Sequence, residues 1–435
     1  MKAHIFIGAR KATSDHRCGC IASGAATTEI QVPVLSSGNE NSNPLPPAGR
    51  RAGEVFRLRD GKRSVVGQGL RAEVERGAIG SFAGRVGAFF AANQGGPRIV
   101  MGALPFDRSE PDYLFQPEIF RTGDGRESEG QPISLPDAVR CAITPAPAPS
   151  AYRDAVAACL EMIAVSAGEA GPLTKVVLSR SLELSSTHDF DATGLLRALA
   201  RDPSVTVFST LLPAGADAAR PLLVGATPEL LVSKKGGEVV SHPLAGSARR
   251  YADPAADRDS AATLETSEKD RREHQAVVDA VFDALSPYCS ELNAPEGTTL
   301  RSTASMWHLG TRVVGRLKDA GTPVAELACA LHPTPAVCGL PRERAAGVIG
   351  QLEGYDRGFY AGAVGWADEK GDGEWYVSIR SARLAGRRAT LYAGAGIVAG
   401  SDPVGETDET SAKFVALLSA LGIDEHGRPL RERAA

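Results

Sequence analysis

The chain has 435 residues, 43% of them hydrophobic and 23% charged, and a formal net charge of -4, which is typical of a globular protein with a substantial core. It lacks the basic surplus of nucleic-acid-binding proteins, and it has no run of about 18 apolar residues that would span a membrane. The seven cysteines have irregular spacing without metal-ligand pairs, so we expect reduced thiols in a cytoplasmic protein.

The N-terminal part of the chain differs in composition from the rest. Residues 1–53 are rich in Ser, Asn, Gly and Pro, which predicts an atypical, partly disordered extension. From residue 54 the pattern changes to short β-like runs at 63–69, 84–92 and 97–106. A proline-rich connector at 145–150 follows, and then an amphipathic helix over 151–168.

Strands dominate the remainder of the chain. A long helix is predicted at 267–285, a short one at 342–352 and a last one at 406–421. Strands are predicted at 175–184, 205–212, 221–233, 238–246, 311–317, 361–368, 374–384 and 390–398. Because strands outnumber helices and often follow one another directly, we expect hairpins and an antiparallel α+β fold.

Two helices carry carboxylates where apolar residues are expected. In the long helix, Ser267 and Asp270 form a variant of the capping box. The apolar stripe that ends at Leu285 leads back through Glu273 and close to Asp270. A carboxylate on a core-facing stripe is costly unless it is paired or holds a cation. The helix alone leaves both a salt bridge to a neighbouring arginine and a metal ligand open.

The last helix repeats this pattern. Glu406, Glu409, Lys413 and Leu417 fall on one face, at spacings of three and four residues. A solvated helix with an internal ion pair would explain that face equally well. Carboxylates on two helices without soft ligands nearby nevertheless favour a hard cation such as Mg²⁺.

Two further residues are candidates for proton transfer. Lys175 lies in an apolar strand near Arg180, where a lysine gives up its proton more readily and can act as a general base. Glu229 follows a proline in apolar surroundings, which would raise the pKa of its carboxyl and keep it protonated as an acid. The alternatives are an ordinary edge-strand lysine and a strand-end glutamate that faces water.

The remaining motifs give weaker evidence of function. His242, His308 and His332 lie in separate motifs without ligand spacing, so we expect structural roles for them rather than metal binding. The sequence contains no dinucleotide fingerprint, no P-loop and no GxSxG turn.

Nine blocks resemble the chorismate-utilising enzyme family, which includes isochorismate synthases, salicylate synthases and the large subunits of anthranilate and aminodeoxychorismate synthases. The resemblance extends from about Glu54 to Leu421. It implies that residues 54–425 form a chorismate-binding catalytic domain of two packed antiparallel sheets with outer helices. The blocks are KVVLSR, GATPELL, PLAGSARR, SEKDRREH, WHLGTRV, LHPTPAVCGLP, EGYDRGFYAGAVGW, GEWYVSIRSA and YAGAGIVAGSDPVGETDETSAK.

The resemblance also implies a role for each site residue. Lys175 matches the base that activates water, and Glu229 matches the acid that protonates the departing hydroxyl. Glu273 and Glu409 match Mg²⁺ ligands, with Glu406 and Asp270 adjacent, and the metal holds the ring carboxylate of chorismate. The substrate-binding positions are Gly246 and Ser247 for the ring carboxylate, His308 near the ring, Ala336 beside the reacting carbons, and Tyr360, Arg380, Gly394 and Lys413 around the enolpyruvyl carboxylate.

Within the family, two positions indicate an isochorismate synthase. Members that use ammonia resemble this chain but carry Gln at the position of Lys175, and salicylate synthases tend to carry Thr at the position of Ala336. The resemblance implies a monomer that feeds a 2,3-dihydroxybenzoate siderophore or menaquinone-type pathway and passes its product to a downstream isochorismate-using enzyme. A salicylate synthase and a non-catalytic interaction subunit are the alternatives. A longer polar loop at 213–220 departs from the family.

Overall fold

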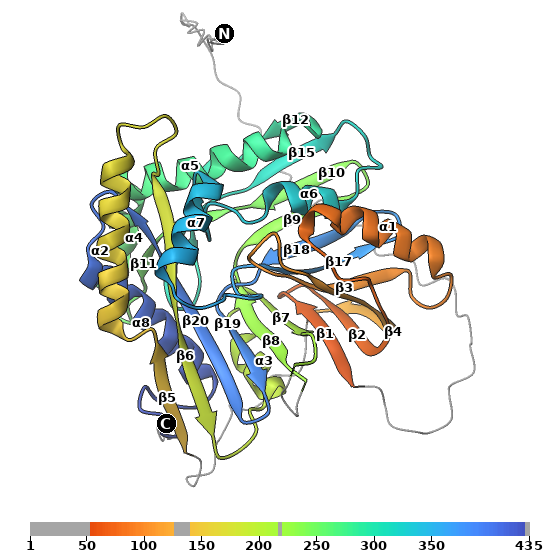
Figure 1. Cartoon of the computed structure of the whole chain (residues 1–435), viewed down its shortest axis with the longest axis horizontal. Coiled ribbons are helices and arrows are strands. Elements are labelled where there is room, and N and C mark those ends of the chain that lie inside the picture. The colour runs from red at the N-terminus through yellow and green to blue at the C-terminus, as the bar shows by residue number, and fades with distance from the viewer. Residues whose placement is uncertain (1–52, 126–139, 216–219, 431–435) are drawn as a thin grey trace, which may run out of the picture. The chain divides into compact units, whose positions relative to one another are not determined.

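A computed structural model describes residues 53–125, 140–215 and 220–430 (Figure 1). The predicted extension at 1–53 lies outside the described residues except for Gly53, as does the centre of the polar loop, residues 216–219. The described residues form one compact unit.

Seventeen strands are joined by antiparallel pairing into one continuous sheet. At one end, β5 (Cys141–Ala146) and β16 (Gly339–Leu340) pair with the same edge of β6 (Lys175–Ser186). The order then continues as β20 (Arg388–Val398), β19 (Ser381–Ala385), β8 (Leu222–Thr227), β7 (Thr206–Leu211), β1 (Glu54–Arg59), β2 (Arg63–Glu73), β4 (Tyr113–Asp124), β3 (Ile99–Leu104), β17 (Ala363–Asp368), β18 (Gly373–Val377), β9 (Leu230–Lys235), β10 (Glu238–His242), β15 (Val313–Leu317) and β12 (Cys289–Asn293).

A small second sheet and the helices complete the domain. The second sheet has the order β11 (Leu244–Arg249), β14 (Met306–Thr311) and β13 (Thr298–Ser302). The helices are η1 (Ile79–Ser81), α1 (Phe82–Ala92), α2 (Pro149–Ser166), α3 (Ala192–Leu199), α4 (Pro254–Thr266), α5 (Glu268–Leu285), α6 (Val324–Leu331), α7 (Arg342–Leu352) and α8 (Pro403–Ala420).

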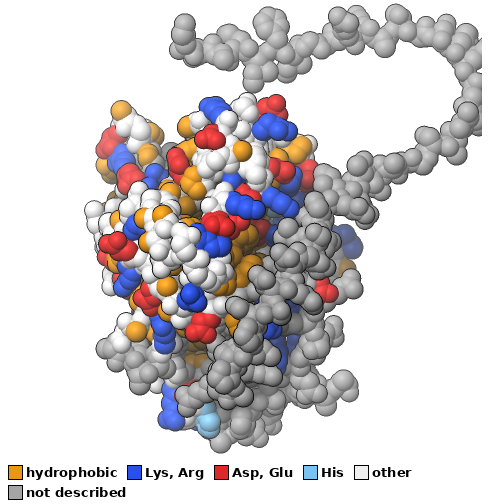
Figure 2. Space-filling view, turned by 90° about the vertical axis from the view of Figure 1, so that its right-hand side faces the viewer, with side chains coloured by type: hydrophobic (Ala, Val, Ile, Leu, Met, Phe, Trp, Pro, Cys, Tyr) orange, Lys and Arg blue, Asp and Glu red, His pale blue; other side chains and the backbone are white. Residues whose placement is uncertain are grey.

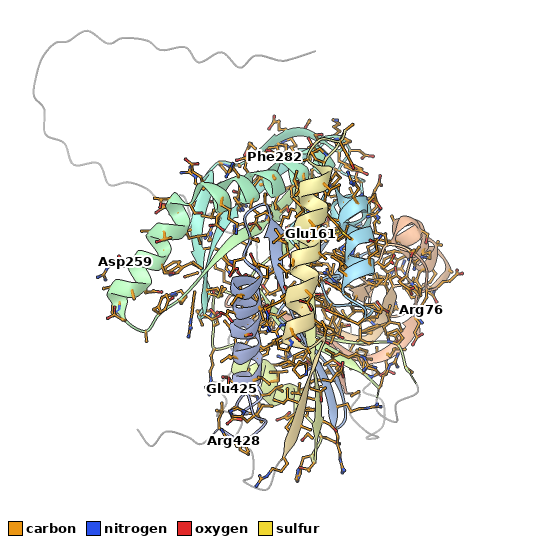
Figure 3. The ribbon with its side chains drawn as sticks, turned by 60° about the vertical axis from the view of Figure 1, so that its left-hand side comes forward. Arg76, Glu161, Asp259, Phe282, Glu425 and Arg428 are labelled. Atoms are coloured by element: carbon orange, nitrogen blue, oxygen red, sulfur yellow. The ribbon has the colours of Figure 1, made fainter. Side chains whose placement is uncertain are left out.

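The large sheet curls, because β3 contacts β7 although three strands lie between them in the pairing order. Its inner surface encloses a core that includes Phe56, Met101 and Phe208. A larger apolar cluster holds α1, α2, α5, α6 and α7 against the sheet, and a third holds α3 and α8. Helices α2 and α8 lie side by side (Figure 3). Two helices expected to carry site residues, α5 and α8, are thus fastened to the sheet by buried apolar faces.

The α+β class, the antiparallel pairing and the β17–β18 hairpin confirm the predictions. The strands that the resemblance assigns to two sheets are joined by pairing into one curled sheet plus the small second one. The prediction of a strand at 84–92 is wrong, because Phe82, Val86, Phe89 and Phe90 bury one face of helix α1. Helices α3, α4 and α6 were not predicted.

The strand predicted at 374–384 is also interrupted. It divides into β18 and β19, and Arg380 between them has a φ of 49°, a left-handed conformation that ends the extended backbone.

Surface and thiol features agree with the composition. On the face shown in Figure 2, Lys and Arg side chains are interspersed with Asp and Glu. The cysteines at 141, 159, 289, 329 and 338 are free thiols, whereas Cys18 and Cys20 lie outside the described residues. In the described ranges, no helix combines the length and apolarity needed to cross a membrane.

Candidate active site

One cavity of about 300 Å³ gathers every residue predicted for the site. Its walls come from β6, β20, β11, β14, α5, α8 and the turns beside β9, α7 and β19. The predicted residues that line it are Lys175, Glu229, Gly246, Ser247, Asp270, Glu273, His308, Ala336, Tyr360, Arg380, Gly394, Glu406, Glu409 and Lys413.

Lys175 and Glu273 form an ion pair in the wall of this cavity. Lys175 is 3% exposed on β6, and its Nζ lies 2.7 Å from Oε1 of Glu273 on α5. The sequence left open a salt bridge between Glu273 and a neighbouring arginine. That interpretation is wrong, since the partner of Glu273 is Lys175. Gly396 on β20 leaves room for this pair, because a Cβ there would lie 2.9 Å from Glu273 Oε1 and 3.2 Å from Lys175 Cε.

Glu229 is a buried carboxyl in the short connection between β8 and β9. It is 2% exposed, and its Oε1 has no hydrogen-bond partner. Burial raises the pKa of Glu229 to about 8, although Lys175, the backbone of Leu244 and Arg380 act in the opposite direction. The carboxyl is thus mostly protonated at neutral pH, as predicted for an acid.

The carboxylates of α8 lie in unequal environments. Glu409 Oε1 accepts hydrogen bonds from Lys413 Nζ at 2.8 Å and from Ser247 Oγ at 2.9 Å. Burial alone would raise the pKa of Glu409, but Lys413 and Ser247 lower it overall. Burial and the neighbouring charge of Glu409 raise the pKa of Glu406 to about 7. Negative charge is therefore crowded at this end of the cavity.

The chemistry of these donors fits a hard divalent cation. Asp270, Glu273, Glu406 and Glu409 bring only carboxylate oxygens to one cavity, which suits Mg²⁺. A cation would also relieve the crowding that disfavours ionised Glu406. Within the described residues, no three His, Cys, Asp or Glu side chains are grouped closely enough to ligate a metal as they stand. Glu273 and Glu409 instead pair with lysines.

Arg380 and His308 form a second polar group in the cavity. Arg380 Nη2 lies 2.5 Å from His308 Nε2, and His308 Nδ1 lies 3.3 Å from the carbonyl oxygen of Gly246. Because a guanidinium only donates and a carbonyl only accepts, His308 carries its proton on Nδ1 and is neutral. Burial, Arg380 and Lys413 lower the pKa of His308 well below its usual value, which agrees with this state.

Arg380 is available to an anionic ligand. Burial lowers its pKa to about 10, so its guanidinium stays charged at neutral pH. Among the described residues, no carboxylate forms an ion pair with it. A buried, charged guanidinium without an acidic partner is suited to bind a carboxylate through two parallel hydrogen bonds.

Two polar side chains that line the cavity, those of Tyr392 and Lys269, were missed by the predictions. Tyr392 stacks on Tyr360 with ring centroids 4.8 Å apart and planes 9° apart, and Lys269 Nζ lies 4.0 Å from Glu406 Oε1. Tyr392, Gly394 and Gly396 lie at two-residue spacing and therefore on one face of β20, so the period of a strand would have indicated Tyr392 as a lining residue. Lys269 precedes Glu273 by one helical turn, which would have placed it on the same face.

Comparisons with known proteins match the same region. A family model described as chorismate binding enzyme matches residues 125–422. Isochorismate synthase DhbC of Bacillus subtilis is 44% identical over 328 residues, which cover 75% of this chain and 81% of that protein. Isochorismate synthase EntC of Escherichia coli K12 is 38% identical over 332 residues, which cover 75% and 81%.

A solved structure of a similar protein also matches the fold of this chain. The crystal structure of DhbC from Bacillus anthracis, a candidate 2,3-dihydroxybenzoate-specific isochorismate synthase, superposes with a TM-score of 0.79 at 40% identity. The superposition covers 86% of this chain and 98% of that one. The family match spans β5 to α8 and therefore includes every residue that lines the cavity.

Proposed function

This chain belongs to the family of chorismate-binding enzymes, and from that premise we propose that it is a magnesium-dependent isochorismate synthase. The reaction adds water at ring carbon 2 of chorismate and removes the hydroxyl of carbon 4, so no redox cofactor takes part. The product would feed a 2,3-dihydroxybenzoate siderophore or menaquinone-type pathway, and we expect a monomer that passes it to a downstream isochorismate-using enzyme.

The observation that carries this proposal is a buried lysine and a buried neutral carboxyl in one cavity. In this proposal Lys175 takes up a proton and Glu229, which burial keeps protonated, donates one, as water addition and hydroxyl loss require. Ammonia needs no base to become a nucleophile, so a lysine in place of Gln at this position favours water.

Substrate binding would rest on groups separate from this pair. Arg380 would bind one carboxylate of chorismate, with Lys413 and Tyr360 nearby, and the amides of Gly246 and Ser247 would face the other. When bound at Glu273 and Glu409, with Glu406 and Asp270 nearby, Mg²⁺ would supply positive charge to the ring carboxylate and would compete with Lys175 for Glu273. Holding both carboxylates leaves the dianion one pose.

The proton transfers then follow from the two residues. Lys175, once it has left Glu273 and lost its proton, would take a proton from the water that attacks carbon 2, and the ring double bonds shift towards carbon 4. Glu229 gives its proton to the hydroxyl that leaves carbon 4 as water. Lys175 ends protonated and Glu229 ionised, and exchange with solvent restores both before the next turnover.

The two alternative functions predict different results when the protein is supplied with chorismate. A salicylate synthase would go on to eliminate pyruvate, which the fluorescence of salicylate would reveal, and Ala336 in the cavity wall disfavours it. A non-catalytic subunit would not turn over chorismate in the presence of magnesium. The joint presence of Lys175, Glu229, Glu273 and Glu409 in one cavity disfavours that alternative.

The substitution Lys175→Gln tests the proposal. Isochorismate formation at saturating chorismate and magnesium should fall by several orders of magnitude, since a glutamine amide cannot take the proton of the attacking water. Lys234→Gln is a matched control, because Lys234 is also buried on a strand and pairs with Asp372 at 2.8 Å, away from the cavity. If Lys175→Gln kept more than about a tenth of the wild-type rate, a barrier increase below ~1.4 kcal/mol would rule out its role as the base.

A further inference from the structure

Strand β6, which carries Lys175, has an incomplete edge. One edge pairs with β20 from Lys175 to Ser185. The opposite edge pairs with β16 at Lys175 and Val176 and with β5 from Ser181 to Ser186. Among the described strands, none pairs with residues 177–180 on that side. Backbone groups there need partners from elsewhere, because an unpaired buried amide or carbonyl is costly.

Two side chains from the segment after α7 occupy this gap. Glu353 Oε1 accepts hydrogen bonds from the amide of Ser179 at 2.6 Å and from Ser179 Oγ at 2.9 Å. Arg357 Nη2 donates to the carbonyl oxygen of Val177 at 2.6 Å. The amide of Val177 bonds to the carbonyl oxygen of Cys338 at 2.8 Å. Apart from this one backbone bond, a carboxylate and a guanidinium make the hydrogen bonds that a neighbouring strand would otherwise make.

The same two residues form a fully buried ion pair. Glu353 is 5% exposed and Arg357 is 3% exposed. Arg357 Nε donates to Glu353 Oε2 at 2.8 Å, and its Nη1 donates to the carbonyl oxygen of Val337 at 2.9 Å. The guanidinium also lies 4.2 Å from the ring centroid of Phe106. Because its polar groups are satisfied by fixed partners, the pair holds its geometry firmly.

The partners of Arg357 are part of the cavity wall. Val177, Val337 and Tyr360 all line the cavity, and the guanidinium lies 5.9 Å from the ring centroid of Tyr360. Val177 is two residues beyond Lys175, and Val337 directly follows Ala336. The ion pair thus contacts the backbone on both sides of the place where the base and the reacting carbons are expected to meet.

We propose that Glu353 and Arg357 are positioning residues, which replace the missing strand beside β6 and thereby fix Lys175 and the Ala336 wall relative to each other. This inference rests on the proposed function, in which Lys175 is the base. The charged and hydroxyl groups proposed for the carboxylates lie mostly on other elements, Arg380 before β19, Ser247 on β11 and Lys413 on α8, and only Tyr360 adjoins the pair. Loss of the pair should therefore reduce catalysis much more than chorismate binding.

The substitution Glu353→Gln tests this. It keeps an oxygen for the amide of Ser179 but removes the charge that holds Arg357. We expect kcat to fall about a hundredfold, the size of effect that follows a small misplacement of a catalytic group. We expect KM for chorismate to stay within about threefold, because binding contacts are retained.

Asp112→Asn is the matched control. Asp112 is 1% exposed and pairs with Arg85 at 2.5 Å, so its loss also breaks a buried ion pair, but neither residue lines the cavity. Its kcat and KM should match those of the wild type even if its Tm falls. If Glu353→Gln and Asp112→Asn changed kcat to the same small extent, Glu353 would be merely structural and the proposal would be overturned.

Two further measurements test the proposal if Glu353→Gln does not fold, or if the protein does not turn over chorismate. Should Glu353→Gln not fold, Glu353→Asp keeps the charge on a shorter side chain, and the same split between kcat and KM is expected of it. Amide hydrogen exchange of residues 176–181 should accelerate in the Glu353 variant but not in Asp112→Asn. Unchanged exchange there would overturn the proposal, whereas accelerated exchange in a protein without chorismate turnover would uphold the edge contact and reject only the proposed function.

Discussion

Replacing Glu229 with Gln should make the protein more stable and far less active. Burial raises the pKa of Glu229 from 4.5 to about 8. At pH 7 the folded protein keeps this proton while the unfolded chain has lost it, so the wild-type carboxyl lowers the free energy of unfolding by about 3 kcal/mol. Gln has a similar shape, cannot ionise, and can accept the same backbone hydrogen bond from Leu244.

The sign of this effect depends on pH. Below about pH 4.5 both states hold the proton, so the ionisation of Glu229 contributes nothing to the free energy of unfolding. As pH rises towards 8 the unfolded chain alone ionises, and wild-type stability is progressively lost relative to the variant. The variant should therefore gain stability over the wild type between pH 4.5 and pH 8, with no further gain above.

Urea unfolding of both proteins at pH 4.5 and pH 7 measures this difference. Isochorismate formation by Glu229→Gln should meanwhile fall by roughly a hundredfold or more, because the leaving hydroxyl has lost its acid. The wild-type kcat should decline as pH rises through about 8, where Glu229 loses its proton. A stability difference independent of pH, or a variant with near-normal kcat, would refute the assignment of Glu229 as a buried acid.

Three other predictions concern the cation, the space around Lys175 and the N-terminus. Glu273→Ala and Glu409→Ala should each abolish turnover, and a chelator should do the same to the wild type, whereas full activity in the chelator would remove the magnesium proposal. Gly396→Ala should lower kcat strongly, because the added Cβ would press on Glu273 and Lys175. The control Gly87→Ala on α1 adds a Cβ with no atom within 4 Å, and its effect on stability should be neutral or favourable. Equal activities of the two variants would contradict the idea that Gly396 leaves room for the Lys175–Glu273 pair. A chain that starts at Gly53 should fold and turn over chorismate normally, and a folded but inactive product would show that residues 1–52 belong to the functional unit.

Much of the fold was predictable where the decisive interactions are local. Helix α5 begins and ends close to its predicted bounds, because Ser267 caps it with a hydrogen bond to the amide of Asp270 and its apolar stripe repeats regularly. Helix α1 was mistaken for a strand, since a short apolar run suits either structure. The packing of Phe82 against Trp375, with ring centroids 5.2 Å apart, is a contact that neighbouring residues do not encode.

The site divides in the same way. The types of its residues follow from the sequence, since carboxylates at helical spacing and a strand lysine can be read directly, and the family blocks assign their roles. Which groups meet was decided by tertiary structure. Lys175 meets Glu273 and Arg380 meets His308 only because a curled sheet brings β6, α5, β14 and the turn before β19 to one cavity. The burial that keeps Glu229 protonated likewise comes from the elements that cover it, because desolvation depends on what surrounds a group in space and not on its neighbours along the chain.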